Sequence, residues 1–316
     1  MGTDVPVAPV NPAVRLPLGI QVFERGWLSS NNILLTSDEQ TTLVDSGYFS
    51  HSEQTLALVK SAVGARQLDF LVNTHLHSDH CGGNAALQRQ YPQMRTLIPP
   101  GHAAEVRDWD PVALTYTPTG QTCPQFRFDQ TLQPGTEIAF GAAVWEVHAA
   151  AGHDPHSVIL FERRNRLLIS ADALWENGFG VVFPELEGID AFAAVGATLD
   201  LIGQLDPKIV IPGHGRVFPF RQEILDRARQ RLDAFIANPP RHANHAVKVL
   251  LKFKLLELQQ LPVADFVRWA VATPYFAQIN SLFFPDKPMA SWIEQLISEL
   301  VKSGAASRSG DLVLNA

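Results

Sequence analysis

Short apolar runs separated by turn residues dominate the first two thirds of the chain. Runs of this kind are typical of strands that are buried on at least one face. They predict strands at residues 17–24, 31–36, 41–45, 68–73, 95–98, 136–140, 143–148, 157–161, 166–170 and 208–212.

Stretches with helical spacing of apolar residues lie among these strands. The first covers residues 50–64, and the spacing of Ser50 and Glu53 predicts a capping box at its start. Another is expected from about Ala191 to Leu205. Strands with interleaved helices predict a mixed α/β fold in which helices cover the faces of the sheets.

The regular pattern breaks down between Pro99 and Pro134, where prolines recur and apolar spacing is lost. Connections of this length serve as functional lids or are disordered. A surface insertion without a function is the alternative, and the sequence leaves all three open.

The composition shifts towards helix after Phe220. Apolar residues at helical spacing predict helices within residues 247–255, 263–271 and 291–304. Ser291 and Glu294 are spaced as a second capping box. Residues 305–314, with a Ser-Gly turn in their middle, predict a terminal hairpin. Three helices and a hairpin resemble a winged helix.

A chain of 316 residues is long enough for two domains. We expect a disordered lead-in at residues 1–14, a main α/β domain at 15–220 and a winged-helix-like domain at 221–316. The formal net charge of −7 gives no general attraction to nucleic acid or anionic lipid. No signal peptide and no membrane span is predicted. Because only two cysteines occur, we expect a reducing cytoplasm.

Four side chains that can bind a metal occur within six residues, directly after the apolar run 70–72. They are His75, His77, Asp79 and His80. Imidazole and carboxylate groups are ligands for divalent zinc, iron or manganese. His75 and His77 are two residues apart, so an extended segment points both the same way. Asp79 and His80 follow a turn and can face a second point, which favours two metal ions over one.

The His75-x-His77-x-Asp79-His80 motif resembles the signature of the metallo-β-lactamase superfamily, in its group with glyoxalase II. Further motifs of that family follow apolar runs in the same order, namely Val44-Asp45-Ser46-Gly47, Gly152-His153, Ser170-Ala171-Asp172 and Pro212-Gly213-His214-Gly215. The resemblance covers roughly residues 17–220. It implies a four-layer αββα sandwich with the metals along one sheet edge.

The resemblance also implies a role for each of these residues. One metal would be held by His75, His77 and His153, and the other by Asp79, His80 and His214. Asp172 would bridge the two ions, and Asp45 would orient a ligand imidazole from behind. Two divalent ions, zinc with manganese or iron as alternatives, would share a hydroxide at this site, with Asp79 and Asp172 next to the reacting atoms.

Some neighbouring residues have two interpretations. Trp175, Phe179 and Phe183 follow the bridging aspartate and are either a substrate wall or ordinary core. Cys81 adjoins the motif, and we expect a small buried residue rather than a ligand. His156 is either a hydrogen-bond donor to the substrate or a solvated loop histidine, and we expect the second.

Three functions compete on the sequence alone. The first is a dinuclear hydrolase of a small acyl ester, thioester or lactone. The second is a single-strand endoribonuclease, because some family members carry a similar tail. Residues 241–316 hold eight Lys and Arg against six Asp and Glu, which is a weak basic bias. The third is a scaffold without catalysis, which the intact ligand set disfavours. The tail is also a candidate contact for a homodimer.

Overall fold

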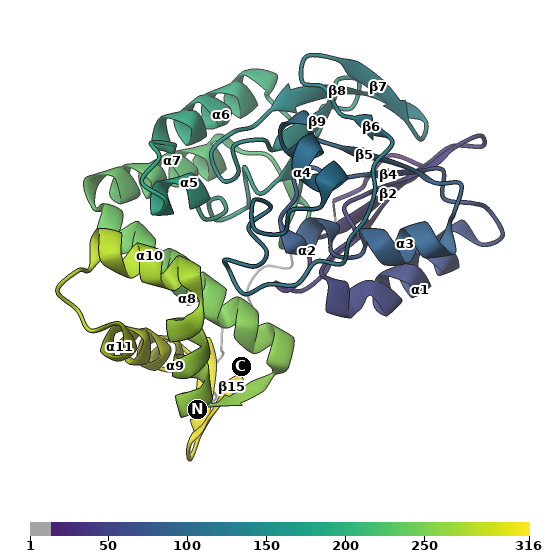
Figure 1. The fold of residues 1–316 in the computed structure, drawn as a ribbon. Coiled ribbons are helices and arrows are strands. Elements are labelled where there is room, and N and C mark those ends of the chain that lie inside the picture. Colours follow the sequence, from purple (N-terminus) through teal and green to yellow (C-terminus); the bar gives the residue numbers. More distant parts are fainter. Residues whose placement is uncertain (1–13) are drawn as a thin grey trace, which may run out of the picture.

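The computed structural model describes residues 14–316 (Figure 1). Of the predicted lead-in at residues 1–14, residues 1–13 lie outside this range. Two six-stranded sheets form the centre of the first two thirds of the chain, and helices and a small sheet follow. The mixed α/β prediction is therefore confirmed.

The first sheet has the strand order β1-β2-β3-β4-β5-β6. Its strands are β1 (Ile20–Phe23), β2 (Asn32–Thr36), β3 (Thr41–Val44), β4 (Phe70–Val72), β5 (Arg95–Ile98) and β6 (Gln130–Thr131). The first three strands pair antiparallel, whereas β3, β4, β5 and β6 run parallel. The carboxyl ends of β3 and β4 therefore meet at the same edge of the sheet.

The second sheet has the order β12-β11-β10-β9-β8-β7. Its strands are β7 (Glu137–Phe140), β8 (Ala143–Ala149), β9 (Val158–Glu162), β10 (Leu167–Ala171), β11 (Ile209–Pro212) and β12 (Phe218–Pro219). All neighbours pair antiparallel except β10 and β11, which are parallel. This sheet also brings two carboxyl strand ends together.

Alternating side chains explain how the two sheets pack face to face. On β2, Ile33 and Leu35 enter the core between the sheets, and Leu34 points to the opposite face. On β9, Leu160 faces the other sheet and Ile159 faces helices. Because both faces of these strands are buried, the strands are continuously apolar, as the sequence predicted.

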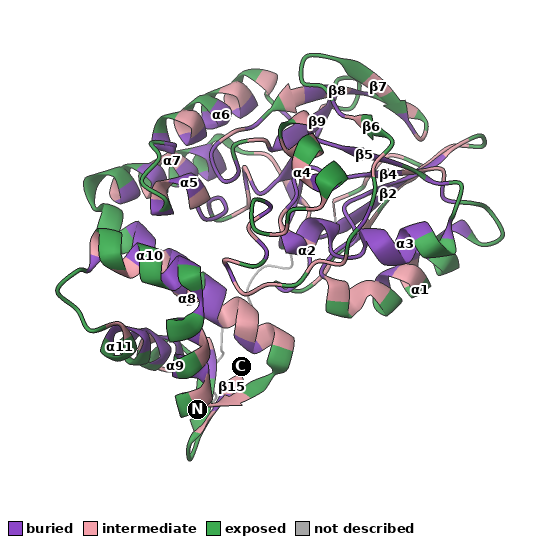
Figure 2. Ribbon diagram, viewed as in Figure 1, coloured by how far each residue is buried: buried purple, intermediate pink, exposed green. Residues whose placement is uncertain are grey.

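Helices cover the outer face of each sheet and complete four layers. They are α1 (Ser52–Val63) and α3 (Asn84–Gln90) on the first sheet, and α6 (Phe192–Leu205) and α7 (Gln222–Ala237) on the second. Figure 2 shows their solvent-facing sides exposed and the strands between them buried. The expected αββα sandwich is confirmed.

The predicted capping box at Ser50 is wrong. A 3-10 turn, η1 (Phe49–His51), precedes α1, so Ser50 already lies within a helical turn. The helix begins at Ser52, whose hydroxyl donates to the carbonyl of Phe49. An N-cap residue needs an extended backbone, and here Tyr48 takes that conformation.

Residues 99–134 contain some regular elements and pack against the rest of the chain. They form the turn η2 (Pro100–His102), the helix α4 (Ala103–Asp108) and the short strand β6. Tyr116 and Phe126 are buried in a cluster that also holds Leu76 and Cys81, next to the metal-ligand motif. The burial of Cys81 confirms the expectation of a small buried residue.

The tail has a three-stranded sheet of order β13-β15-β14. Its apolar core also includes Val181 and Leu186 from the preceding α/β part. Its elements are α8 (Pro239–Leu258), β13 (Gln260–Pro262), α9 (Val263–Ala272), α10 (Pro274–Phe283), α11 (Met289–Lys302), β14 (Ala306–Ser309) and β15 (Leu312–Asn315). The terminal hairpin is confirmed as β14 and β15. The winged-helix likeness and the domain boundary after residue 220 stay predictions.

The second predicted capping box is also wrong. The helix α11 begins at Met289, directly after Pro288, so Ser291 lies inside its first turn. Pro288 is the N-cap residue of this helix, and its fixed φ of −56° suits a helix start. The pattern of polar residues does not reveal that alternative.

Across residues 14–316, no helix combines the length and the apolar character that a membrane crossing requires.

The core between the sheets predicts a stability test. Leu160 is fully buried there, so Leu160→Ala should lower the free energy of unfolding by about 2–5 kcal/mol. Leu282 on α10 is 51% exposed, so Leu282→Ala should change the free energy of unfolding by less than about 0.5 kcal/mol. Chemical denaturation measures both, and equal losses would contradict this packing.

Candidate metal centre

The candidate ligands lie at one edge of the sandwich, where strands of both sheets end. The first sheet supplies the segment after β4, which carries His75 and His77 and continues into the one-turn helix α2 (Ser78–Cys81). The second sheet supplies Asp172 after β10 and His214 after β11. His153 comes from the connection between β8 and β9. The structure thus brings all seven candidate metal ligands to one place.

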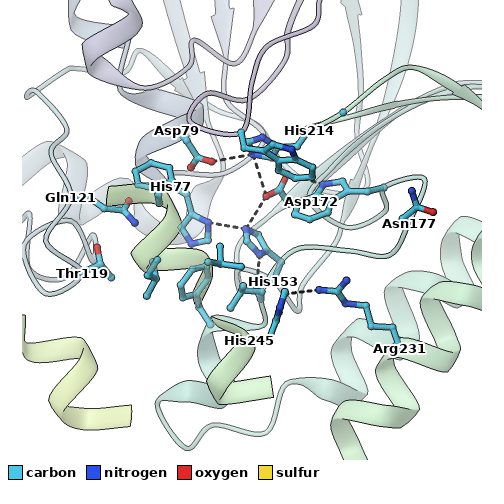
Figure 3. A pocket seen from close by; sticks show the side chains of 18 of the residues that line it. His77, Asp79, Thr119, Gln121, His153, Asp172, Asn177, His214, Arg231 and His245 are labelled. Atoms are coloured by element: carbon cyan, nitrogen blue, oxygen red, sulfur yellow. Dashed lines mark hydrogen bonds and ion pairs between the residues drawn. The ribbon is translucent and has the colours of Figure 1, made fainter. Parts of the chain in front are cut away.

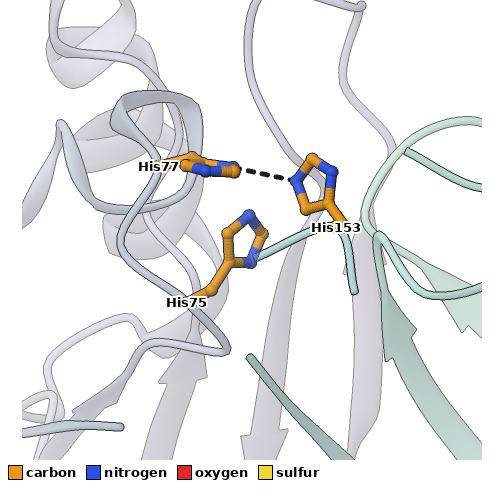
Figure 4. A group of neighbouring side chains, drawn as sticks. All are labelled: His75, His77 and His153. Atoms are coloured by element: carbon orange, nitrogen blue, oxygen red, sulfur yellow. Dashed lines mark hydrogen bonds between the residues drawn. The ribbon is translucent and has the colours of Figure 1, made fainter. Parts of the chain in front are cut away.

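Three histidines form the first group (Figure 4). His75, His77 and His153 place one ring nitrogen each within 4.8 Å of the others. His77 Nδ1 lies 2.8 Å from His153 Nε2. His153 Nδ1 donates to the carbonyl of Val181 at 2.5 Å, so its Nε2 is left as the acceptor. Three nitrogens that converge on one point are the arrangement in which imidazoles hold a cation.

Asp79, His80 and His214 form a second group with the same spacing. Asp79 Oδ2 lies 3.1 Å from His214 Nε2 and 4.0 Å from His80 Nε2. His75, His80 and Asp172 also lie within 4.8 Å of one another, and this third combination links the other two.

Asp172 faces both groups with its two carboxylate oxygens (Figure 3). Its Oδ2 lies 3.4 Å from His153 Nε2 and 3.9 Å from His214 Nε2. Its Oδ1 lies 3.5 Å from His80 Nε2 and accepts from Trp175 Nε1 at 3.2 Å. This is the position that a bridging ligand requires.

Asp45 supports the centre from behind. It is buried and has a positive φ of 59° at the end of β3. Its Oδ2 accepts from His80 Nδ1 at 2.8 Å and from the Thr74 hydroxyl at 2.8 Å. Its Oδ1 accepts from the Thr74 backbone amide at 2.9 Å. These contacts fix the proton of His80 on Nδ1 and leave Nε2 directed at Asp79 and Asp172.

Gly213 shows how closely the backbone approaches the ligands. A Cβ added at this residue would lie 2.2 Å from Asp172 Oδ1 and 3.0 Å from His80 Cε1. The glycine of the last motif is therefore a steric requirement of the site.

Burial keeps two of the imidazoles neutral. It lowers the pKa of His77 to about 4, and it lowers the pKa of His75 well below the usual range, with neighbouring imidazoles adding to the effect. For His80, burial acts in the same direction, but the charges of Asp45, Asp172 and Asp79 outweigh it and raise the pKa. A cation among these carboxylates would compete with the proton that they hold on His80.

The two carboxylates of the centre stay ionised. Burial alone would raise the pKa of Asp172, but His214 and His80 hold it well below the usual range. The pKa of Asp79 is lowered for the same reason, because His80 and His214 outweigh the effect of burial. Ionised carboxylates and neutral imidazoles are the forms in which these groups bind metals.

A cavity of about 410 Å³ lies in front of the ligands. Trp27, Trp175 and Phe183 form apolar walls, and the Trp27 ring stacks on His214 with a centroid distance of 5.4 Å. Of the three aromatic residues left open above, Trp175 and Phe183 line the cavity. Phe179 is buried in the core under the second sheet instead. His156 does not line the cavity, and its half-buried ring packs edge-on against His102.

Two parts of the chain contribute cavity residues that the sequence did not reveal. The segment 99–134 supplies Thr115, Thr119 and Gln121, and the tail helix α8 supplies His245, Val249, Leu250 and Phe253. Apolar residues at helical spacing on α8 are indistinguishable in sequence from core residues. No local signal could therefore have assigned them to the cavity.

Two known proteins are similar in sequence to this chain over more than half of its length. The hydroxyacylglutathione hydrolase of Anaeromyxobacter dehalogenans (strain 2CP-C) is 29% identical over 201 residues, which are 63% of this chain and 67% of that protein. The acyl-coenzyme A thioesterase MBLAC2 of Gallus gallus is 26% identical over 228 residues, which are 64% of this chain and 80% of that protein.

A solved structure of a beta-lactamase domain protein from Burkholderia ambifaria has the same fold. Its TM-score is 0.60 at 19% identity, over 96% of this chain and 94% of that one. The family model of the metallo-beta-lactamase superfamily matches residues 25–214, which is more than half of the chain. The chain therefore belongs to the metallo-beta-lactamase superfamily and is a metal-dependent hydrolase.

Proposed function

We propose that this chain is a dinuclear hydrolase that acts on a small acyl thioester, ester or lactone. The observation that carries the proposal is the pair of ligand groups on either side of Asp172. Each group can hold one ion, and Asp172 lies next to residues of both groups. Zinc suits these nitrogen and oxygen donors, and manganese and iron accept them as well.

Two buried nitrogens support this assignment. Among the described residues, His75 Nε2 and His80 Nε2 have no hydrogen-bond partner. Buried polar atoms without a partner are rare in folded proteins, because an unsatisfied group costs free energy. Both nitrogens belong to the ligand groups, so a bound cation would satisfy them.

The chemistry follows from the groups that face the cavity. Bound divalent ions would lower the pKa of water from about 16 to about 7 and polarise a carbonyl. Asp45 holds the proton on His80 Nδ1, and the Val181 carbonyl holds the proton on His153 Nδ1. Asp79 and Asp172 present ionised carboxylates to the cavity, where they would accept hydrogen bonds from the attacking water.

The shape of the cavity favours an acyl substrate. Val249, Leu250 and Phe253 of α8 add an apolar wall, on which a hydrocarbon acyl group would lie. Trp27 and Phe183 add further apolar surface to the same cavity. The names of two relatives, a hydroxyacylglutathione hydrolase and an acyl-coenzyme A thioesterase, support a thioester.

The endoribonuclease alternative has less support. Three lysines of the tail are already engaged within the tail. Lys248 pairs with Glu299 at 2.9 Å, and Lys254 pairs with Glu257 at 2.7 Å. Lys252 donates to the Ala305 carbonyl at 2.5 Å. Nucleic-acid binding, a homodimer through the tail and a cytoplasmic location stay predictions.

A paired turnover assay on metal-loaded protein tests the proposal. One arm offers acyl thioesters, esters and lactones, and the other offers single-stranded RNA. We expect chelator-sensitive turnover in the acyl arm, reduced at least about a hundredfold in His77→Ala, because that variant removes a ligand nitrogen. His148→Ala is the matched control, since His148 lies on β8 outside the cavity and contacts Glu146. Turnover of RNA alone would overturn the acyl proposal.

Asp45 gives a separate test by metal affinity. Asp45→Asn removes the charge that orients His80 and should weaken metal binding by about 10–100-fold. Competition with a chromogenic chelator measures this loss without a substrate. Asp38→Asn, in the exposed turn between β2 and β3, should leave the affinity unchanged. An unchanged affinity in Asp45→Asn would show that Asp45 does not act through the metal ligands.

A further inference from the structure

The cavity in front of the metal ligands adjoins a second, larger hollow of about 880 Å³ between α7 and α8. Asn177, Arg231 and His245 line both spaces. Figure 3 shows Arg231 reaching towards His245 on the side of the cavity away from Asp79. Arg231 therefore stands where the two spaces meet.

Arg231 has no acidic partner among residues 14–316. Its Nη2 donates to His245 Nε2 at 2.7 Å, and its buried Nε has no hydrogen-bond partner. Its guanidinium lies over the rings of Phe179 and Phe235, at 5.6 and 5.2 Å from their centroids. A half-buried guanidinium among aromatic rings, without a carboxylate, leaves its charge and a donor uncompensated.

The surroundings of Arg231 add positive charge. Arg227, Arg241 and Lys248 also line the larger hollow. Glu299 is the one carboxylate among the described residues that line it, and Glu299 pairs with Lys248. Burial, with Arg231 as the next cause, lowers the pKa of His245 to about 3. His245 is therefore neutral near pH 7 and accepts from Arg231.

The loop after Asp172 holds Arg231 in place. Gly178 has a φ of +121°, and a Cβ added there would lie 2.9 Å from Arg231 Cδ. Arg227, one turn earlier on α7, donates to the carbonyl of Glu176 in the same loop at 3.0 Å. The loop that carries a candidate metal ligand at one end thus packs against Arg231 at the other.

We propose that Arg231, with Arg241 further out, forms a subsite for an anionic group on the leaving-thiol side of the substrate. The planar guanidinium can bind a carboxylate or a phosphate through two parallel hydrogen bonds. This inference rests on the proposed function, because it places the acyl group at the metal ligands and the thiol portion towards α7. The substrate class is then a thioester of an anionic thiol.

Three thioesters with the same acyl group test the subsite. Acylglutathione carries carboxylates, acyl-coenzyme A carries phosphates, and acyl-N-acetylcysteamine is uncharged. Arg231→Gln should lower kcat/KM at least about tenfold for the anionic thioester that the subsite takes, and less than about twofold for the uncharged one. The anionic compound that shows the loss identifies carboxylate or phosphate as the ligand.

Arg229→Gln is the matched control. Arg229 lies on the same helix and pairs with Asp200 at the surface, outside both cavities, so all three values should stay unchanged. An equal loss on the charged and uncharged thioesters in Arg231→Gln would assign Arg231 a structural role and overturn the subsite. No loss on any of them would overturn it as well.

Calorimetry with the corresponding non-hydrolysable thioethers separates the subsite from the proposed function. If the wild-type protein hydrolyses no thioester, but Arg231→Gln weakens binding of an anionic thioether about tenfold, the subsite stands and the thioesterase proposal falls. If hydrolysis occurs and Arg231→Gln binds every thioether as the wild type does, the subsite falls and the hydrolase stands.

Discussion

The crowding of ionisable groups at one buried edge of the sandwich is the constraint on which the structure depends. Seven imidazole and carboxylate side chains share this edge, and several of their nitrogens face one another at short range. Imidazole nitrogens that converge in this way must be separated by a proton or a cation. The outer contacts from Asp45 and Val181 already use the other nitrogens of His80 and His153. The inward nitrogens are therefore left for a metal.

Much of the fold could be predicted because its strands are short, apolar and regularly punctuated. The parts that were missed share a physical cause. The helix starts at Ser52 and Met289 depend on a preceding turn and on a proline, and polar spacing does not record these. The packing of residues 99–134 depends on a few buried aromatic residues, such as Tyr116 and Phe126, spread over a proline-rich stretch. Local periodicity carries no information about such contacts.

The candidate ligands could be named from the sequence because each follows a strand, and parallel strands end at a common edge. Asp45, which directly follows β3, lies against the ligand His80 as the resemblance implied. The walls of the cavity could not be named in this way. Arg231 on α7 and Phe253 on α8 approach the ligands only through tertiary packing. Their positions at the cavity result from contacts between distant parts of the chain, and the spacing of residues in the sequence does not show such contacts.

The candidate ligands and much of the cavity wall lie on different parts of the chain, and this separation has an evolutionary consequence. The ligand set is carried by the sandwich, whereas α8 supplies much of the wall that a substrate would touch. Substitutions on α8 can therefore change which compounds enter without disturbing the catalytic chemistry. Two relatives can share every ligand motif and still differ in their substrates. The helix on which they would differ, α8, lies outside the matched region, residues 25–214.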